Sequence, residues 1–372
     1  MNRKTRVAVL YGGKSGEHEV SLKSAASVLR YLDRDRFEPV PISIDKQGRW
    51  QCHDLRRIEA TNGDSLPIPA DSPMIRFEAQ GAQTAILPAD NTAPAIAPVD
   101  VVFPVIHGPL CEDGAVQGLL ELAGAAYVGS GVLASAVGMH KDIAKRLAAL
   151  AGLPVAPYLA LSRRDYRRDP EGSIEAAREA LTLPVFVKPC NMGSSVGVHK
   201  VKRWEDLDAA LTDAFLYDIK VLIEQGIDAR EIEVAVLDGD PPVASVASEL
   251  NAGPQHEFYS YEAKYIDQDG ATVDLPAKLD AGQMARVRQL AIDAFVALEC
   301  SGLARVDFFL DRQSGAFYFN EINTLPGFTA ISMYPKMMKA SGLPYPALLT
   351  RLIELAQERH AERAGLKTDY AG

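Results

Sequence analysis

The chain has 372 residues, of which 47% are hydrophobic and 24% charged, so it is long enough for two or three globular domains. Its formal net charge of −10 argues against nucleic acid as a general partner, and an anionic ligand would need a locally basic pocket. The four cysteines are scattered, and no apolar run is long enough to cross a membrane. We therefore expect a cytoplasmic protein without disulfides, structural zinc, a signal peptide or a membrane partner.

The beginning of the chain alternates between strand and helix patterns, which indicates a βαβ unit. The apolar run RVAVLYGG (6–13) predicts a buried strand that ends in a glycine turn. EVSLKSAASVLRYL (19–32) has the apolar spacing of a helix, and FEPVPISI (37–44) predicts a second strand. Residues 46–97 are polar and rich in Pro and Ala, so we expect a long, partly irregular excursion there.

Three domains with an α/β fold follow from the remaining pattern. A buried strand over VDVVFPVIHG (99–108) belongs to the first domain, which we place at residues 1–139. A helix over 140–153 and strands over 183–189 and 220–227 indicate a central domain. We place it at residues 140–226. Hairpins over 231–243 and 304–323, with a helix over 283–300 between them, indicate a last domain. We place it at residues 227–372.

The Gly/Ser-rich stretch CNMGSSVGV (190–198) fits two incompatible kinds of site. Its G-x-S-x-G sequence matches the nucleophile elbow of a serine hydrolase, which would make Ser195 a nucleophile. It is also a short loop of the kind that folds over phosphates. An elbow needs a strand, a sharp turn and a helix, whereas the residues after Ser195 look extended. We therefore prefer the phosphate loop, and the order of Asp307 and His360 alone does not exclude the hydrolase.

The hairpin over 304–323 is predicted to present a polar face. Side chains alternate along a strand, so Arg305 and Asp307 share one face, as do Glu321 and Asn323 on the return strand. With a five-residue loop over 311–315, Arg305 would lie opposite Glu321. Carboxylate and amide oxygens at this spacing suit Mg²⁺. The alternative is an exposed Arg305–Glu321 salt bridge, and a loop of even length would turn Glu321 to the opposite face.

Lysines and glutamates lie where other predicted strands and loops end. Lys188 alternates out of an apolar strand beside the Gly/Ser loop, and this position favours a phosphate contact. Lys141 and Lys264, each taken alone, are interpreted as solvated surface lysines. Glu224 ends a predicted strand and Glu231 follows it, so both could bind ribose hydroxyls or be solvated.

Several segments together resemble the ATP-grasp superfamily, and within it the D-alanine–D-alanine ligases. They span almost the whole chain in the family order: YGGKSGEHEVSL, HGPLCEDG, VKPCNMGSSVGV, YEAKY, ARVDFFL and NEINTLPGFTAIS. The resemblance implies an N-terminal parallel βαβ domain and two α+β domains that clamp ATP between antiparallel sheets. It also implies that the Gly/Ser loop covers phosphate and that Ser195 is not a nucleophile.

The resemblance implies the following site residues. The residues implied to bind ATP are Lys141, Lys188, Ser194, Ser195, Glu224, Glu231 and Lys264. The ligands implied for two Mg²⁺ ions, with Mn²⁺ as an alternative, are Asp307, Glu321 and Asn323. The residues implied to contact the two D-alanines or the oxyanion are Glu19, Ser194, Tyr265, Arg305, Gly327 (through its N–H) and Ser332. Within this group, Glu19 is expected to accept the ammonium group of the first D-alanine, with Ser194 and Tyr265 as its partners.

The activity implied is the ATP-dependent joining of two D-alanines through an acyl phosphate, for peptidoglycan precursor synthesis. The loop over 256–277 is expected to close as a lid, and Tyr265 points to an amine rather than a hydroxy acid as the second substrate. The partners expected are D-alanine, ATP and a second copy of the chain in a homodimer. Two alternatives stay open: another ATP-grasp ligase of the same mechanism, including one that forms an ester with a hydroxy acid, and a catalytically inactive nucleotide-binding regulator.

Overall fold

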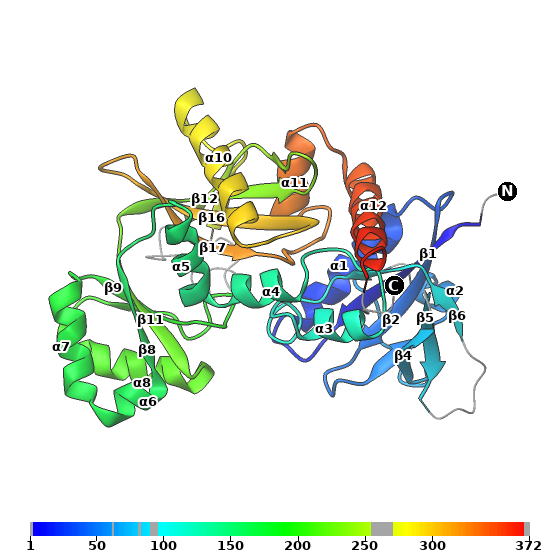
Figure 1. The fold of residues 1–372 in the computed structure, drawn as a ribbon, viewed down its shortest axis with the longest axis horizontal. Helices are drawn as coiled ribbons and strands as arrows, with labels where there is room; N and C mark the ends of the chain where they lie inside the picture. The colour runs from blue at the N-terminus through cyan, green and yellow to red at the C-terminus, as the bar shows by residue number, and fades with distance from the viewer. Residues whose placement is uncertain (1–2, 62, 81–82, 90–95, 254–270, 368–372) are drawn as a thin grey trace.

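The computed structural model describes residues 3–61, 63–80, 83–89, 96–253 and 271–367, whose strands form four sheets (Figure 1). The first sheet has three parallel strands and an antiparallel edge strand, in the order β3 (Trp50–Cys52), β2 (Phe37–Ile44), β1 (Thr5–Gly12) and β7 (Val101–Pro104). Helix α1 (His18–Tyr31) joins β1 to β2, so the predicted βαβ unit is confirmed. Val7 to Tyr11 are fully buried, as expected for a central parallel strand.

The segment predicted as an excursion is more regular than expected. It contains β3, the short helix α2 (Leu55–Glu59) and a separate antiparallel sheet of β4 (Ile75–Gln80), β5 (Gln83–Pro88) and β6 (Ile96–Val99). Ile75, Ile86 and Val99 are buried together with apolar side chains of the first sheet. The apolar residues of this segment are too few to form long runs, but they alternate along short strands. This alternation indicates strands, and the polar, Pro-rich composition of the segment makes it hard to recognise.

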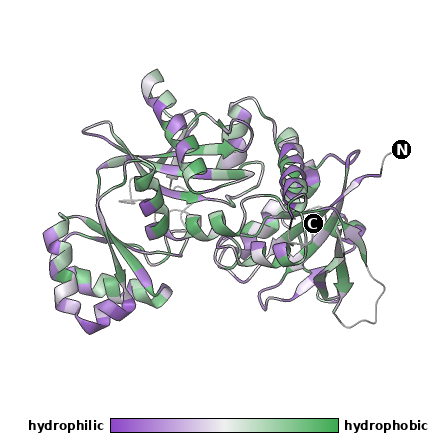
Figure 2. Cartoon of the chain, viewed as in Figure 1, coloured by the Kyte–Doolittle hydropathy of each residue, from purple (hydrophilic) through white to green (hydrophobic). Residues whose placement is uncertain are grey.

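The second sheet is antiparallel and lies at the lower left of Figure 1. Its strands are, in order, β10 (His199–Val201), β9 (Val185–Pro189), β11 (Lys220–Gln225) and β8 (Tyr158–Ser162). The helices around it are α6 (Arg163–Arg168), α7 (Pro170–Ala180) and α8 (Leu207–Tyr217). Figure 2 shows green strands and more purple on these helices. Val187 and Ile223 of the strands share one buried core with Ala177 and Leu211 of the helices, so the helices cover an apolar face of the sheet.

The third sheet, also antiparallel, holds most of the polar residues predicted near the C-terminus. Its strands are β15 (Ala271–Asp274), β14 (Ser248–Ala252), β12 (Ala229–Leu237), β16 (Leu303–Asp311) and β17 (Phe317–Asn323), with β13 (Val243–Ala244) beside β12. Helix α10 (Ala281–Ala297) begins at a capping box formed by Asp280 and Gln283. Its buried side, with Val287, Leu290 and Phe295, packs in one core with the strands.

Other helices connect these sheets. They are α3 (Ala115–Leu122), α4 (Val132–Met139), α5 (Lys141–Leu150), α11 (Met333–Ala340) and α12 (Tyr345–Ala364). The α/β fold class predicted from the sequence is confirmed. No helix in the described part of the chain is long and apolar enough to span a membrane.

The N-terminal and C-terminal parts of the chain touch at two glycines. Gly129 and Gly302 have φ angles of +98° and +72°, and a Cβ on Gly302 would lie 3.1 Å from the Gly129 Cα. Beside them, Arg359 of α12 donates to the carbonyls of Gly129 and Tyr127 and to Ser301 Oγ. Its guanidinium lies 4.6 Å from the centre of the Tyr127 ring. One side chain of α12 therefore ties three segments together.

Candidate active site

The second and third sheets meet at a buried cluster of charged residues. Lys188 of β9 lies 3.4 Å from Asn320 Oδ1 of β17, and its Nζ stands 5.3 Å from the centre of the Phe309 ring on β16. The same Nζ is 2.5 Å from Glu224 Oε2 on β11. Lys145 of α5 lies 2.6 Å from Glu224 Oε1 and donates to the Phe319 carbonyl. Two cations thus surround one carboxylate.

Glu224 stays ionised in this cluster. Its burial favours the neutral acid, but Lys145 and Lys188 outweigh that effect and lower its pKa to about 2. Its Oε1 atom has no hydrogen bond of good geometry, although Lys145 lies close to it. The Lys145 ammonium 2.6 Å away compensates the charge of this buried oxygen. The cluster therefore holds one ionised carboxylate between two cations at the meeting of the two sheets.

The polar face on β16 and β17 is present, but its predicted register is wrong. Leu310 pairs with Phe317, so six residues rather than five separate the paired positions. The pairing then shifts by one residue between Phe308 and Asp307, which leaves Asn320 as the extra residue of a β-bulge.

The bulge restores the face that the longer loop would have lost. Asp307 lies directly opposite Glu321, and Arg305 lies opposite Asn323. Without the bulge, Asp307 would face Asn320 and Glu321 would turn to the buried side of the sheet. The bulge also brings the Asn320 amide oxygen to Lys188, so it joins the polar face to the buried cluster.

Arg305 and its acidic neighbours form a second charged group. Arg305 donates two hydrogen bonds to the Asp307 carboxylate, at 2.7 and 2.6 Å, and its Nε lies 3.3 Å from Glu233 on β12. Burial and the neighbouring carboxylates Glu233 and Glu321 raise the pKa of Asp307 to about 6, despite Arg305. Glu233 was not predicted as a site residue. The alternation of EIEV, which places Glu231 and Glu233 on one face, was the available signal.

The donor set fits a magnesium ion that also binds phosphate oxygens. Asp307 and Glu321 supply carboxylates and Asn323 an amide oxygen, and Mg²⁺ in proteins is typically held by one or two carboxylates plus substrate phosphates. Within the described ranges, no group of three His, Cys, Asp or Glu residues could hold a metal by itself. Lys141 Nζ lies 3.1 Å from Glu321 Oε2 and also donates to the Met192 carbonyl, beside the Gly/Ser loop.

The Gly/Ser loop does not have the geometry of a nucleophile elbow. It leaves β9 at Pro189 and enters another strand, β10, rather than a helix, so the serine hydrolase hypothesis is wrong. Ser194 and Ser195 both have left-handed backbone conformations, with φ of +54° and +58°. Gly197 follows with φ of +68°, and a Cβ there would lie 2.6 Å from the Tyr217 ring. The loop is tightly folded.

Ser194 contacts a different glutamate from the one predicted. Its Oγ donates to Glu17 Oε1 at 2.7 Å, so the expected contact with Glu19 is wrong. Glu19 is 63% exposed and pairs with Lys46. Glu17 is the residue before α1, whereas Glu19 lies within its first turn, and positions two apart in a helix point to different sides. The sequence motif GEHE has two candidates, and only the backbone geometry separates them.

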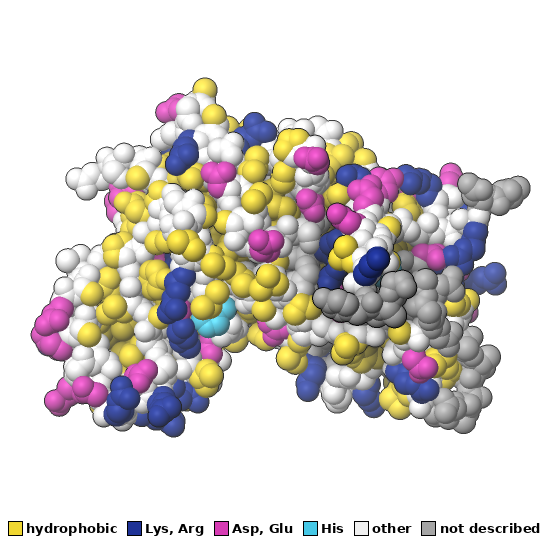
Figure 3. All heavy atoms as spheres, viewed as in Figure 1, with side chains coloured by type: hydrophobic (Ala, Val, Ile, Leu, Met, Phe, Trp, Pro, Cys, Tyr) yellow, Lys and Arg dark blue, Asp and Glu magenta, His cyan; other side chains and the backbone are white. Residues whose placement is uncertain are grey.

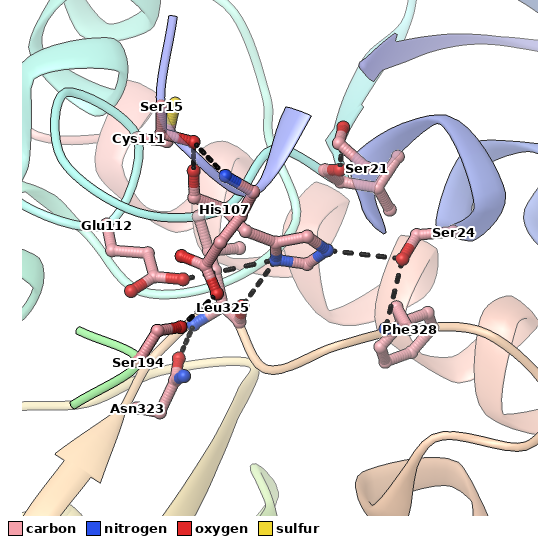
Figure 4. A network of polar contacts seen from close by, with 12 residues as sticks. Ser15, Ser21, Ser24, His107, Cys111, Glu112, Ser194, Asn323, Leu325 and Phe328 are labelled. Carbon is pink, nitrogen blue, oxygen red and sulfur yellow. Dashed lines mark hydrogen bonds and ion pairs between the residues drawn. The ribbon is translucent and has the colours of Figure 1, made fainter. Parts of the chain in front are cut away.

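Two further residues near Glu17 were missed by the sequence analysis. His107, in the loop after β7, is buried between Ser24 and the Leu325 carbonyl, and Glu112 lies 3.9 Å from its Nδ1 (Figure 4). Burial first, and then the charge of Glu17, raise the pKa of Glu112 to about 8. The motif HGPLCEDG contains both residues.

The other predicted residues lie as follows. Gly327 and Ser332 are close, because a Cβ on Gly327 would lie 3.3 Å from Ser332 Oγ, which also accepts from the Thr329 N–H. Glu231 pairs with Phe309 across β12 and β16, so it lies on the strand beside the charged cluster. Lys264 and Tyr265, with most of the expected lid, lie outside the described residues.

Comparison with known proteins gives a consistent result. Residues 6–130 match the family described as "D-ala D-ala ligase N-terminus", and residues 147–354 match "D-ala D-ala ligase C-terminus". The chain is 65% identical over 373 residues to "D-alanine--D-alanine ligase A" of Bradyrhizobium diazoefficiens, covering 100% of both chains. It is 48% identical over 365 residues to the protein of the same name from Chromobacterium violaceum, covering 96% of each.

Solved structures agree with these matches. The D-alanine-D-alanine ligase from Coxiella burnetii superposes with a TM-score of 0.83 at 37% identity, covering 97% of this chain and 96% of that chain. The VanG D-Ala:D-Ser ligase from Enterococcus faecalis has a TM-score of 0.81 at 34% identity and covers 95% of this chain and 100% of that chain.

Proposed function

The chain belongs to the D-alanine–D-alanine ligase family and has its ATP-grasp fold, and on that premise we propose that it joins two D-alanines at the expense of ATP. The product, D-alanyl-D-alanine, would serve peptidoglycan precursor synthesis in the cytoplasm. The observation that carries the proposal is the 2.7 Å bond from Ser194 to Glu17. It places a carboxylate suited to an ammonium group directly beside a loop suited to phosphate.

The proposed reaction has two steps. A carboxylate oxygen of the first D-alanine attacks the γ-phosphorus of ATP, which releases ADP and leaves an acyl phosphate. The neutral amine of the second D-alanine then attacks the acyl carbon. The resulting tetrahedral oxyanion expels inorganic phosphate and the nitrogen loses a proton, giving the dipeptide. The first step depends mainly on positioning and charge neutralisation, and the second on donors directed at the oxyanion.

We propose that Glu17, rather than Glu19, accepts the ammonium group of the first D-alanine. The hydrogen bond from Ser194 of the Gly/Ser loop to Glu17 supports this role. Glu19 is exposed and pairs with Lys46 instead. Arg305 and the Gly327 N–H would stabilise the oxyanion, with Ser332 beside them. Tyr265 is proposed as a further partner of the Glu17–Ser194 pair, as the family resemblance implies.

The proposed ATP contacts follow the charged cluster. Lys141, Lys188 and the Ser194–Ser195 loop would neutralise and enclose the phosphates, and Lys264 would close over them. Glu224 would accept from the adenine amine and Glu231 would bind ribose, as the family resemblance implies. Asp307, Glu321 and Asn323 would hold two Mg²⁺ ions, or Mn²⁺ in their place. A metal bound there would supply positive charge to the phosphates.

We also propose three domains over residues 1–139, 140–226 and 227–372, and a homodimer. Separate sheets in each range support the domains. Exposed leucines on α3 and α4, with Leu122 at 87% and Leu133 at 63% exposure, support a second copy as the partner. Light scattering of the purified protein would measure the mass, and a strictly monomeric particle at micromolar concentration would contradict the homodimer.

A substrate comparison tests the function. Phosphate release from ATP should require D-alanine and Mg²⁺ together, and L-alanine should not replace D-alanine. Mass analysis of reactions with D-alanine plus D-serine or D-lactate would identify mixed products and test the ester-forming alternative. Comparable phosphate release with L-alanine would reject the assignment, and a protein that binds ATP without any release would favour the inactive regulator.

A further inference from the structure

The loop Leu325–Phe328 is held by side chains from distant parts of the chain (Figure 4). The Leu325 N–H donates to Asn323 Oδ1 at 2.9 Å, and the Leu325 carbonyl oxygen lies 3.0 Å from His107 Nδ1. At the other end of the loop, the Phe328 N–H lies 3.4 Å from Ser24 Oγ, on helix α1. Ser24 Oγ is also 3.1 Å from His107 Nε2. Both ends of the loop are thus connected to one Ser–His pair.

The direction of each hydrogen bond in this group follows from the chemistry of its atoms. A carbonyl oxygen only accepts, so His107 Nδ1 must carry the proton that it donates to Leu325. Burial lowers the pKa of His107, so the ring is neutral and its Nε2 accepts. Ser24 must then donate its single proton to Nε2 and accept from the Phe328 N–H with a lone pair. Only this set of donors and acceptors gives a partner to the Leu325 carbonyl, the His107 ring, the Ser24 hydroxyl and the Phe328 N–H together.

The hydrogen-bonded group lies in a well-packed interior. Ser24 is fully buried and His107 almost so, and Leu325 and Phe328 of the loop are also buried. A buried polar group that loses its partner is costly, so the hydrogen bonds favour one position of the loop over small displacements from it.

Gly327 lies between the two fixed ends. Its N–H has no hydrogen-bond acceptor within the part of the chain that the structure describes, so it is available to a ligand. A Cβ at Gly327 would lie 3.3 Å from Ser332 Oγ, which leaves little room for the loop to shift in that direction. The orientation of this N–H is set by residues on either side of it.

We infer that Ser24 is a positioning residue for the second step of the reaction. It would hold the Leu325–Phe328 loop directly through Phe328 and indirectly through His107, so that the Gly327 N–H points at the oxyanion. Ser24 itself would touch neither substrate nor ATP. This inference rests on the proposed function, because it requires an oxyanion at Gly327.

The test compares Ser24→Ala with Ser21→Ala. Ser21 lies on the same helix, is equally buried, and bonds the Gly12 N–H and the Val105 carbonyl instead of the loop. Dipeptide formation would be measured together with positional isotope exchange in ¹⁸O-labelled ATP, which reports acyl-phosphate formation alone. We expect Ser24→Ala to slow dipeptide formation by about tenfold or more, since small displacements of reacting groups cost that much, and to leave isotope exchange within about twofold of wild type.

Ser21→Ala should change neither rate by more than about twofold, even if it unfolds at a lower temperature. Ser24→Thr keeps the hydroxyl but crowds a fully buried site, so it should be the less stable and yet the more active of the two Ser24 variants. Equal losses in both steps, or losses in all three variants that follow only their unfolding temperatures, would overturn the inference. A wild-type protein that makes no dipeptide would instead overturn the proposed function.

Discussion

Two glutamates at the start of α1 offer a direct test at the scale of single residues. Glu17 accepts from Ser194, whereas Glu19 forms an exposed ion pair with Lys46. Glu17→Gln should lower kcat/KM for D-alanine by about 10²-fold, because the charged acceptor for an ammonium group is lost. Glu19→Gln should stay within about twofold, since exposed pairs contribute little. Steady-state kinetics of both variants decides between them, and the reverse order would restore Glu19 as the ammonium acceptor.

Glu224 predicts a pH dependence of stability. Its pKa falls from an ordinary 4.5 to about 2 in the folded protein, because Lys145 and Lys188 outweigh the effect of burial. A lowered pKa contributes stability that is complete above pH 4.5 and is lost as the pH falls toward 2; the full contribution is about 3 kcal/mol. Glu224→Gln lacks this contribution. Urea unfolding of both proteins should therefore show a stability gap at pH 7 that narrows between pH 5 and pH 3, and a constant gap would contradict the prediction.

At the scale of elements, the Gly/Ser loop requires glycine at one position and not at another. Gly197 has φ of +68° and no room for a Cβ beside Tyr217, whereas a Cβ on Gly193 would have no neighbour within 4 Å. Gly197→Ala should therefore lower the free energy of unfolding by about 1–3 kcal/mol, and Gly193→Ala by much less. Thermal unfolding measures both. Similar unfolding temperatures for the two variants would mean that the loop relaxes easily around the added methyl group.

Elements with a clear local pattern could be predicted from the sequence. The βαβ unit, the strand VFVKP and the hairpin containing Arg305 and Asp307 all have periodic apolar residues, and each formed as expected. The register of that hairpin could not be predicted, because a bulge at Asn320 depends on contacts between strands rather than on the sequence of either one.

The candidate site was predicted unevenly for a related reason. Residues inside quoted motifs were found, but the choice between Glu17 and Glu19 depended on where α1 begins. His107 and Glu233 escaped notice because their partners, Leu325 and Arg305, lie far away in the sequence. Such contacts exist only after the sheets have come together.

At the scale of the whole molecule, Arg359 links parts of the chain that lie far apart in sequence. It bonds the Tyr127 and Gly129 carbonyls and Ser301, where Gly129 and Gly302 meet. Arg359→Ala should lower the free energy of unfolding by about 2–3 kcal/mol, because buried carbonyls lose a charged donor. Arg351→Ala, which removes a surface pair from the same helix, is the control and should change it by less than about 1 kcal/mol. Urea unfolding compares the two, and equal midpoints would show that other contacts hold the junction.

Charge is distributed in contrasting ways over the molecule. On the face shown in Figure 3, acidic and basic side chains are interspersed, and the net charge of −10 does not gather into one patch there. The cations Lys145 and Lys188 are instead concentrated in the interior around one carboxylate. An anionic substrate would thus be attracted at short range, after it has entered, more than from a distance.

The bulge at Asn320 makes odd and even lengths matter in the hairpin of β16 and β17. One extra residue in the turn and one in the strand each invert the side chains that follow, and two inversions cancel. A single insertion or deletion in the turn would therefore bury Glu321 and Asn323, whereas the same change paired with loss of the bulge would leave them in place. A change in the length of this turn would therefore keep Glu321 and Asn323 on the polar face only if the bulge at Asn320 changed as well. In related sequences, turn length and the presence of the bulge should vary together.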